Sequence, residues 1–178
     1  MGTSDNAPTT RRPLVSSTVL RTLHEERGFV LVDVGNVGCL ALGGAASTES
    51  AAVLQNLLLR MGKTYPTISI LTIASFELVI PDQALRNAFR HVLEATSSLI
   101  ACSGVVAPSH AFAASTVRGI ITDINLAPST SFPLKVSSNL REVIRWLGPQ
   151  HAKLTGTHVT EATLLEAANH VLRHPLLT

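Results

Sequence analysis

Histidines and cysteines are the residues of this chain whose spacing first raises the question of chemistry. His170 and His174 stand four residues apart, the spacing with which two histidines on one helix hold zinc. The intervening glutamate of zinc proteases is missing, and Pro175 follows at once. Cys39 and Cys102 each lie inside an apolar run, without the spacing of a zinc site or a disulfide framework. We therefore expect no metal, and we expect both thiols to be buried and unbridged.

Serine and acidic residues show no arrangement typical of catalysis. Cys102-Ser103-Gly104 lies inside a predicted strand and lacks the Gly-x-Ser-x-Gly pattern of a nucleophile elbow. Ser109 and His110 are neighbours at a predicted helix start, where a serine caps the backbone. Asp33 and Asp123 are isolated, and the glycine pairs match no nucleotide-binding loop. The sequence predicts a protein without enzymatic activity and without a cofactor.

The composition favours one soluble domain with modest extensions. Of 178 residues, 46% are apolar and only 15% are charged, which favours self-association because few charges cover the surface. The net charge is +2 and the basic residues are dispersed, so we expect no nucleic-acid partner. No apolar run approaches the roughly 18 residues of a membrane span. A cytoplasmic location without a membrane span is the expectation.

The elements that would carry these residues begin with a polar, disordered tail at 1–13. The apolar spacing over 17–27 predicts a helix that closes at Gly28. Two β-branched runs then flank Gly35-Asn36, a strong signal for an antiparallel hairpin of 29–34 with 37–42.

From residue 47 on, helices and strands alternate, which predicts parallel strands joined by right-handed crossovers. Gly148-Pro149 is expected to end the helix before it. The fold class is α/β with a mixed, mostly parallel sheet (β-β-α-β-α-β-α-β-α) and an extra helix at each end. The expected helices begin at Ser47 or Thr48, at Asp82, at Ser109 and at Ser138 or Asn139, and the expected strands cover 68–74, 99–107 and 132–136.

This order resembles that of STAS domains, named for sulfate transporters and anti-sigma-factor antagonists. The resemblance covers about residues 29–147. In similar uncharacterised bacterial domains, a segment like Ala113-Ala-Ser-Thr-Val-Arg-Gly-Ile-Ile121 precedes one like Phe132-Pro-Leu-Lys-Val136, and the last helix ends in Trp-Leu, here Trp146-Leu147. The resemblance implies a non-enzymatic docking module whose domain spans 14–149, followed by a helical extension at 150–178.

The resemblance also directs attention to the start of the helix near Asp82. In the antagonist branch, a phosphorylated serine stands there; this chain has Ile80-Pro81-Asp82-Gln83 and no serine or threonine. We therefore expect no phosphorylation switch at this place. Two interpretations of Asp82 stay open: a helix cap, or part of a partner-facing rim. The expected partner-binding residues are Glu77, Pro81, Asp82 and Gln83.

A last helix is predicted over 159–173 and carries an apolar stripe. This packing or oligomer helix is expected to bury the stripe on the chain's own sheet or on a second protomer. The function expected is a protein-interaction or regulatory module that docks to a partner protein or assembles with itself. The alternative is a small-molecule or lipid binder with an apolar pocket between the sheet and the terminal helices. The residues of the stripe are Leu164, Leu165, Val171 and Leu172.

Overall fold

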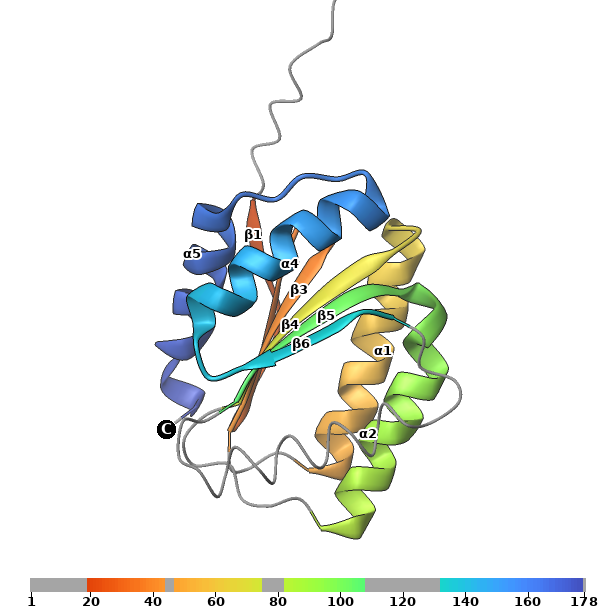
Figure 1. The fold of residues 1–178 in the computed structure, drawn as a ribbon. Helices are drawn as coiled ribbons and strands as arrows, with labels where there is room; N and C mark the ends of the chain where they lie inside the picture. The colour runs from red at the N-terminus through yellow and green to blue at the C-terminus, as the bar shows by residue number, and fades with distance from the viewer. Residues whose placement is uncertain (1–18, 44–46, 75–81, 108–131, 178) are drawn as a thin grey trace, which may run out of the picture.

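Six strands form one sheet whose spatial order follows the chain (Figure 1). The structure is a computed structural model and describes residues 19–43, 47–74, 82–107 and 132–177. Neighbouring strands are antiparallel from β1 to β3 and parallel from β3 to β6, which confirms the predicted mixed, mostly parallel α/β sheet. The strands are β1 (Leu20–Glu26), β2 (Phe29–Val34), β3 (Val37–Leu42), β4 (Ile68–Ala74), β5 (Ile100–Val106) and β6 (Leu134–Ser137).

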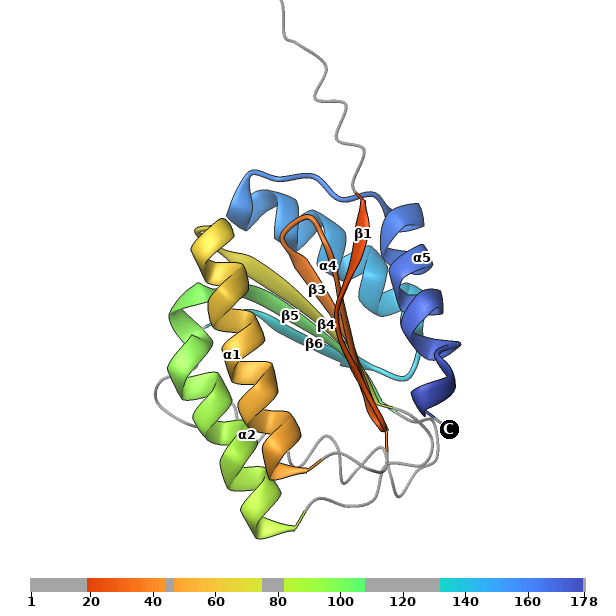
Figure 2. The same cartoon turned by 180° about the vertical axis from the view of Figure 1, so that it is seen from behind.

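Helices cover both faces of the sheet. α1 (Thr48–Thr64) and α2 (Gln83–Thr96) lie on one face, in front in Figure 2, and α4 (Leu140–Thr155) and α5 (Glu161–Leu172) lie on the other. Two short 3-10 helices, η1 (Ser97–Leu99) and η2 (Pro175–Leu177), precede β5 and follow α5. The helix predicted to begin at Ser109 lies outside the described residues. No helix within these ranges is both long and apolar enough to cross a membrane.

The central strands are buried on both faces, which explains their nearly continuous apolar runs. Every residue of β2 is buried, and its side chains alternate between two core clusters. Val30, Val32 and Val34 pack toward α4 and α5, whereas Phe29 and Leu31 pack toward α1 and α2.

The hairpin at Gly35-Asn36 is confirmed. Val34 lies opposite Val37, and Gly35 adopts φ 63°, a conformation that costs a glycine little. Asn36 also ties the turn to the chain before β4, because its side-chain amide donates to the Thr67 carbonyl at 3.2 Å.

The helix predicted over 17–27 is wrong, because residues 20–26 form β1. Leu20 packs in the cluster beneath α5, whereas Leu23 packs in the cluster on the opposite face. A spacing of three puts two residues on one face of a helix but on opposite faces of a strand, and here each of the two leucines meets a core cluster, so the apolar spacing imitates a helix. Gly28 has φ 76°, which suits a helix end and a tight turn equally. The pairing of residues 20–26 with β2 makes it part of a turn between two strands.

The expected helix end at Gly148-Pro149 is also wrong. α4 continues through Pro149 and ends at Gly156, which has φ 72°. A proline inside a helix removes one backbone hydrogen bond, and burial of the following turn compensates for that loss. His151, in that turn, is completely buried.

Candidate functional site

The first turn of α2 carries two of the predicted partner-binding residues. Asp82 caps the helix, since its Oδ1 accepts a hydrogen bond from the Leu85 amide at 2.8 Å. This confirms the capping role of Asp82. Gln83 lies at the first helical position and is exposed. Glu77 and Pro81 lie outside the described residues.

An exposed hydrogen-bond network extends from Gln83 along the outer side of α2. The Gln83 amide nitrogen donates to Asn87 Oδ1 at 2.9 Å, and Arg86 Nη2 donates to Gln83 Oε1 at 3.0 Å. These bonds hold three polar side chains in one arrangement at the surface. We call Asp82, Gln83, Arg86 and Asn87 the α2 rim.

The half of α2 that carries this rim contributes little to the core. No side chain from Gln83 through His91 is fully buried, whereas Val92 and Thr96 are. Leu85 and Phe89 are only partly buried. The first turns of α2 therefore combine polar and apolar surface, the mixture found in protein interfaces.

The C-terminal helix packs within its own chain. Leu164 and Val171 have no exposed surface and join the cluster above β2 and β3. Leu165 is partly buried against the same cluster, but Leu172 remains 41% exposed. The end of the described chain is also tied to the sheet, because the Gly28 amide donates to the Leu176 carbonyl at 2.7 Å.

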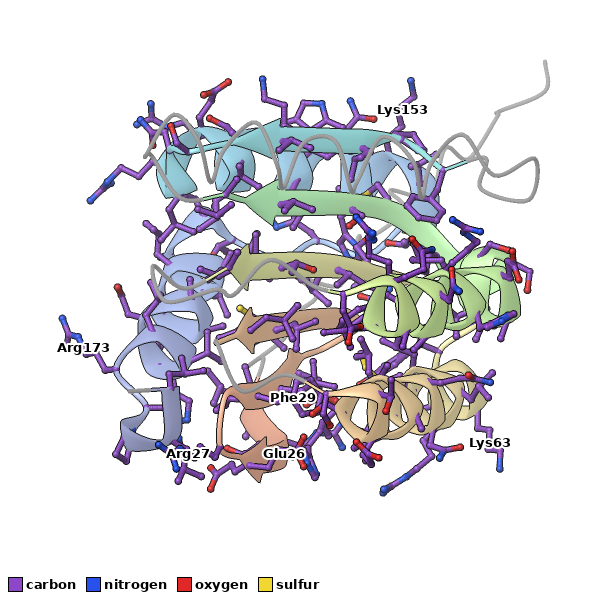
Figure 3. The ribbon with its side chains drawn as sticks, turned by 90° about the horizontal axis from the view of Figure 1, so that it is seen from below. Glu26, Arg27, Phe29, Lys63, Lys153 and Arg173 are labelled. Carbon is purple, nitrogen blue, oxygen red and sulfur yellow. The ribbon has the colours of Figure 1, made fainter. Side chains whose placement is uncertain are left out.

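A shallow groove of about 760 Å³ runs along the outer side of α5. Its position differs from the pocket expected between the sheet and the terminal helices, where buried side chains fill the layer. Figure 3 shows Arg173 at the end of α5 directed away from the sheet. The lining residues are Ala162, Leu165, Glu166, Asn169, His170, Arg173, His174 and Pro175.

His170 and His174 do not assemble a metal site. Their ring centroids are 6.4 Å apart, and His174 Nε2 lies 3.2 Å from a carboxylate oxygen of Glu25 on β1. Across the described ranges, no group of three or more histidine, cysteine or acidic side chains is placed to hold a metal ion.

Nucleophilic and basic side chains meet between α4 and the sheet, at a place that sequence patterns did not indicate. Ser69 on β4, Cys102 on β5 and His151 on α4 have no exposed surface. Ser69 Oγ lies 2.8 Å from His151 Nδ1 and 3.2 Å from Cys102 Sγ. Thr155 Oγ1 lies 3.4 Å from His151 Nε2 on the other side of the ring. We call these four residues the His151 cluster.

One tautomer of His151 gives a partner to all four residues. Thr155 donates its hydroxyl proton to the His151 carbonyl at 2.8 Å, so its oxygen is left to accept from Nε2–H. With the proton of the neutral ring on Nε2, His151 Nδ1 accepts from the Ser69 hydroxyl. Ser69 in turn accepts from the Cys102 thiol. When His151 is neutral, every side chain of the cluster therefore has a hydrogen-bond partner.

Burial controls ionisation in this cluster. Desolvation, followed by the effect of His158, lowers the pKa of His151 to about 4. Burial raises the pKa of the Cys102 thiol as well. Cys39 is likewise buried and unbridged, and burial raises its pKa to about 12. The predicted burial of both free cysteines is confirmed, and neither thiol has the ionisation or exposure of a nucleophile.

A second polar contact fixes the edge strand on the opposite face. Arg21 on β1 pairs with the buried Asp33 on β2, with Arg21 Nε 2.9 Å from Asp33 Oδ1. A guanidinium nitrogen of Arg21 also reaches the Tyr65 hydroxyl at 3.3 Å. The hydrogen bond to Asp33 is the main cause of the raised pKa of Arg21. Asp33, isolated in the sequence, is therefore a partner of Arg21 that joins β1 to β2.

The sequence contained one signal for the His151 cluster. Val143, Leu147 and His151 follow one another at intervals of four, so all three share one helical face. Extending the helix past Pro149 would have placed His151 in the core.

Comparisons of this chain with protein-family models, with curated proteins and with solved structures return no match.

Proposed function

We propose that this chain is a non-enzymatic protein-interaction module of the STAS-like type, which acts in the cytoplasm by docking a partner protein at the α2 rim. The observation that carries the proposal is the arrangement of Gln83, Arg86 and Asn87. Gln83 bonds to both of the others in an exposed network, on a half-helix that has no fully buried side chain. Such a network loses little conformational entropy on binding because its side chains already restrain one another.

The chemistry of the rim indicates the kind of partner. Asp82 offers a carboxylate, Arg86 a guanidinium, and Gln83 and Asn87 amides, while Leu85 and Phe89 add apolar surface beside them. This mixture suits a protein surface with both charges and an apolar centre. An anionic small ligand is disfavoured, because Asp82 already occupies the positive end of the helix dipole.

The proposal of a non-enzymatic role draws support from the His151 cluster. Ser69, Cys102 and His151 are the nucleophile and base types that hydrolases use, but all three are fully buried. Their hydrogen-bonding groups are occupied by one another and by Thr155. They serve packing between α4 and the sheet in this conformation.

The test compares two substitutions on the same helix. Gln83→Arg places a new charge in the rim and leaves the Asp82 cap intact, whereas Ala95→Arg adds the same charge at an exposed position near the other end of α2. Affinity capture from the source cell should give one stoichiometric protein with the wild-type chain and with Ala95→Arg. Gln83→Arg should lose it while melting at nearly the same temperature. Retention of the partner by both variants would exclude the rim.

Self-assembly is the second form of the same proposal. Leu172 and Leu176, near the end of the described chain, are 41% and 37% exposed, and the chain has few charges. Light scattering of the purified protein would give its mass in solution. A monomer at all concentrations would exclude self-assembly.

The alternative proposal is a small-molecule or lipid binder. The groove along α5 favours it, because its lining combines apolar and charged side chains. Leu165 and Pro175 would contact apolar parts of a ligand there, and Arg173 its polar end. Native mass spectrometry of the freshly purified protein would detect a bound ligand, and mass equal to the bare chain would count against this alternative.

A further inference from the structure

The proposed docking function makes no use of the His151 cluster, although this cluster is a long-range connection between α4 and two strands. Ser69 belongs to β4, Cys102 to β5 and His151 to α4. All three have no exposed surface, so the bonds among them are shielded from water. Hydrogen bonds in such a low-dielectric place depend strongly on the protonation state of their members.

One backbone hydrogen bond of α4 is missing two residues before His151. Pro149 has no backbone N–H, so the helical hydrogen bond to the Arg145 carbonyl cannot form. Gly148 precedes it and adds backbone freedom. The segment 150–155 is therefore joined to the rest of α4 with one backbone hydrogen bond fewer than a regular helix has, and the bond from His151 to Ser69 ties it to the sheet.

We propose that the His151 cluster is an acid-released latch: protonation of His151 frees the end of α4 from β4 and β5, about Gly148-Pro149, and exposes the Cys102 thiol.

Protonation removes the acceptor on which the cluster depends. The Ser69 hydroxyl donates to His151 Nδ1, and an imidazolium carries a proton at that atom. Two donors would then face each other unless the Ser69 hydroxyl turned away. His151 has two hydrogen-bond partners, Ser69 and Thr155, and neither carries a charge. A buried imidazolium would therefore have no counter-ion among them.

The nearby ionisable groups point in the same direction. His158, in the connection between α4 and α5, lowers the pKa of His151. On β5, Cys102 is a neutral thiol, because burial raises its pKa. Lys153 on α4 lies on the exposed side.

Two carboxylates on the elements around α4 have other partners, and a third, Glu166 on α5, lines the outer groove. Glu142 in the first turn of α4 lies 2.6 Å from Lys135 on β6, and Glu161 on α5 lies 3.4 Å from Arg145. Neither carboxylate is paired with His151. A proton on the ring is therefore stabilised far better in an open, hydrated state than in the closed one.

Site-resolved thiol labelling tests the proposal, because the two cysteines lie under different helices. α4 packs on β5, which carries Cys102, whereas α5 packs on β3, which carries Cys39. The full-length protein is treated with 4,4′-dithiodipyridine, a reagent that reacts with thiols in acid as well as at neutral pH. Peptide mass spectrometry gives the labelling rate of each cysteine between pH 7.5 and pH 4.5. Rates are divided by those of the denatured protein at the same pH.

The normalised labelling rate of Cys102 should rise about tenfold or more between pH 7.5 and pH 4.5, since the open state binds the proton more tightly than the closed state does. The normalised labelling rate of Cys39 should rise less. Equal rises at both cysteines would mean that acid unfolds the whole domain, and constant rates at both would mean that nothing opens. Either result overturns the proposal.

Two histidine variants assign the effect. His151→Gln should flatten the pH dependence of Cys102 labelling, because glutamine does not titrate in this range. His91→Gln removes an exposed histidine on α2 and should behave like the wild type. A steep pH dependence that survives in His151→Gln would overturn the proposal.

A further variant keeps the test decisive where His151→Gln fails to fold. Pro149→Ala retains His151 and restores the missing backbone donor of α4. It should lower the acid labelling rate of Cys102 and leave that of Cys39 unchanged. An unaltered Cys102 rate in this variant would contradict the role of Gly148-Pro149 as the point of opening.

Discussion

His151 Nδ1 lies 2.8 Å from Ser69 Oγ, although 82 positions separate the two residues in the chain. The bond connects α4 to β4 through a layer that water does not reach. Since the imidazole must be neutral to accept this bond, the relationship couples the stability of the fold to pH.

Acid should destabilise the protein through His151. Its pKa is about 4 in the folded protein and about 6.5 in an unfolded chain, so the unfolded state binds the proton first. The contribution of His151 to stability is present above pH 6.5 and declines as the pH falls toward 4, by on the order of 3 kcal/mol in all. Urea denaturation at several pH values measures this slope. His151→Gln should flatten it between pH 6.5 and pH 4, and an equal slope in wild type and variant would contradict the assignment.

Pro149→Ala should stabilise the protein. Alanine supplies the N–H that the helix lacks at this position, and its helix propensity exceeds that of proline by about 3 kcal/mol. The gain should be smaller than this where the native helix has already adjusted to the proline. A higher melting temperature is expected, and a lower one would show that the proline ring itself makes a needed contact. Gln150→Ala, one residue further along α4, serves as the control.

Gly104→Ala should be poorly tolerated. A Cβ on Gly104 would lie 2.5 Å from Val143 Cγ1, and Val143 on α4 is completely buried and has a stiff side chain. A loss of about 1–3 kcal/mol is expected in denaturation experiments. Gly38→Ala on β3 is the matched control, because its Cβ would meet Leu31 and Met61 at an ordinary 3.6 Å. Adding Val143→Ala to Gly104→Ala should recover part of the loss, and no recovery would place the strain elsewhere.

Asp82→Ala should lower the stability by about 1 kcal/mol through loss of the helix cap. Asp82→Asn keeps a capping oxygen and should remain close to the wild type. Thermal melting of both variants separates the cap from partner binding. If Asp82→Ala melts like the wild type and yet loses its partner, docking rather than capping is the main role of this residue.

A chain ending at Gly156 keeps α4 and removes α5. The removal exposes the strand surfaces beneath Leu164 and Val171. Burial of each of these two side chains contributes roughly 1.5–3 kcal/mol to the stability of the fold. It also removes the Leu176 carbonyl that accepts from Gly28. We expect aggregation or a large fall in melting temperature, measured by light scattering and circular dichroism. A soluble chain with an unchanged melting point would show that α5 adds little.

Local chemistry was sufficient for part of this fold. Gly35 permits the positive φ of the β2–β3 turn, and Asp82 and Asn139 cap α2 and α4 through their own side chains. Each of these features depends on atoms within a few residues of one another, so the sequence predicts it directly. The apolar stripe of α5 is likewise visible in the local sequence. Whether the stripe packs on its own sheet or on a second chain does not follow from the local sequence.

Two features depended on partners far away in the sequence. Residues 20–26 have helical apolar spacing, but pairing with β2 and the bond from Arg21 to Asp33 make them a strand. α4 passes through Pro149 because the turn that follows buries His151 against Ser69. In both places the free energy gained by long-range pairing and burial exceeds the local conformational preference of the residues. That gain arises only when the tertiary structure brings the distant partners together. The same reason placed Ser69, Cys102 and His151 together: three elements of the fold bring them into contact, and no spacing within the sequence records it.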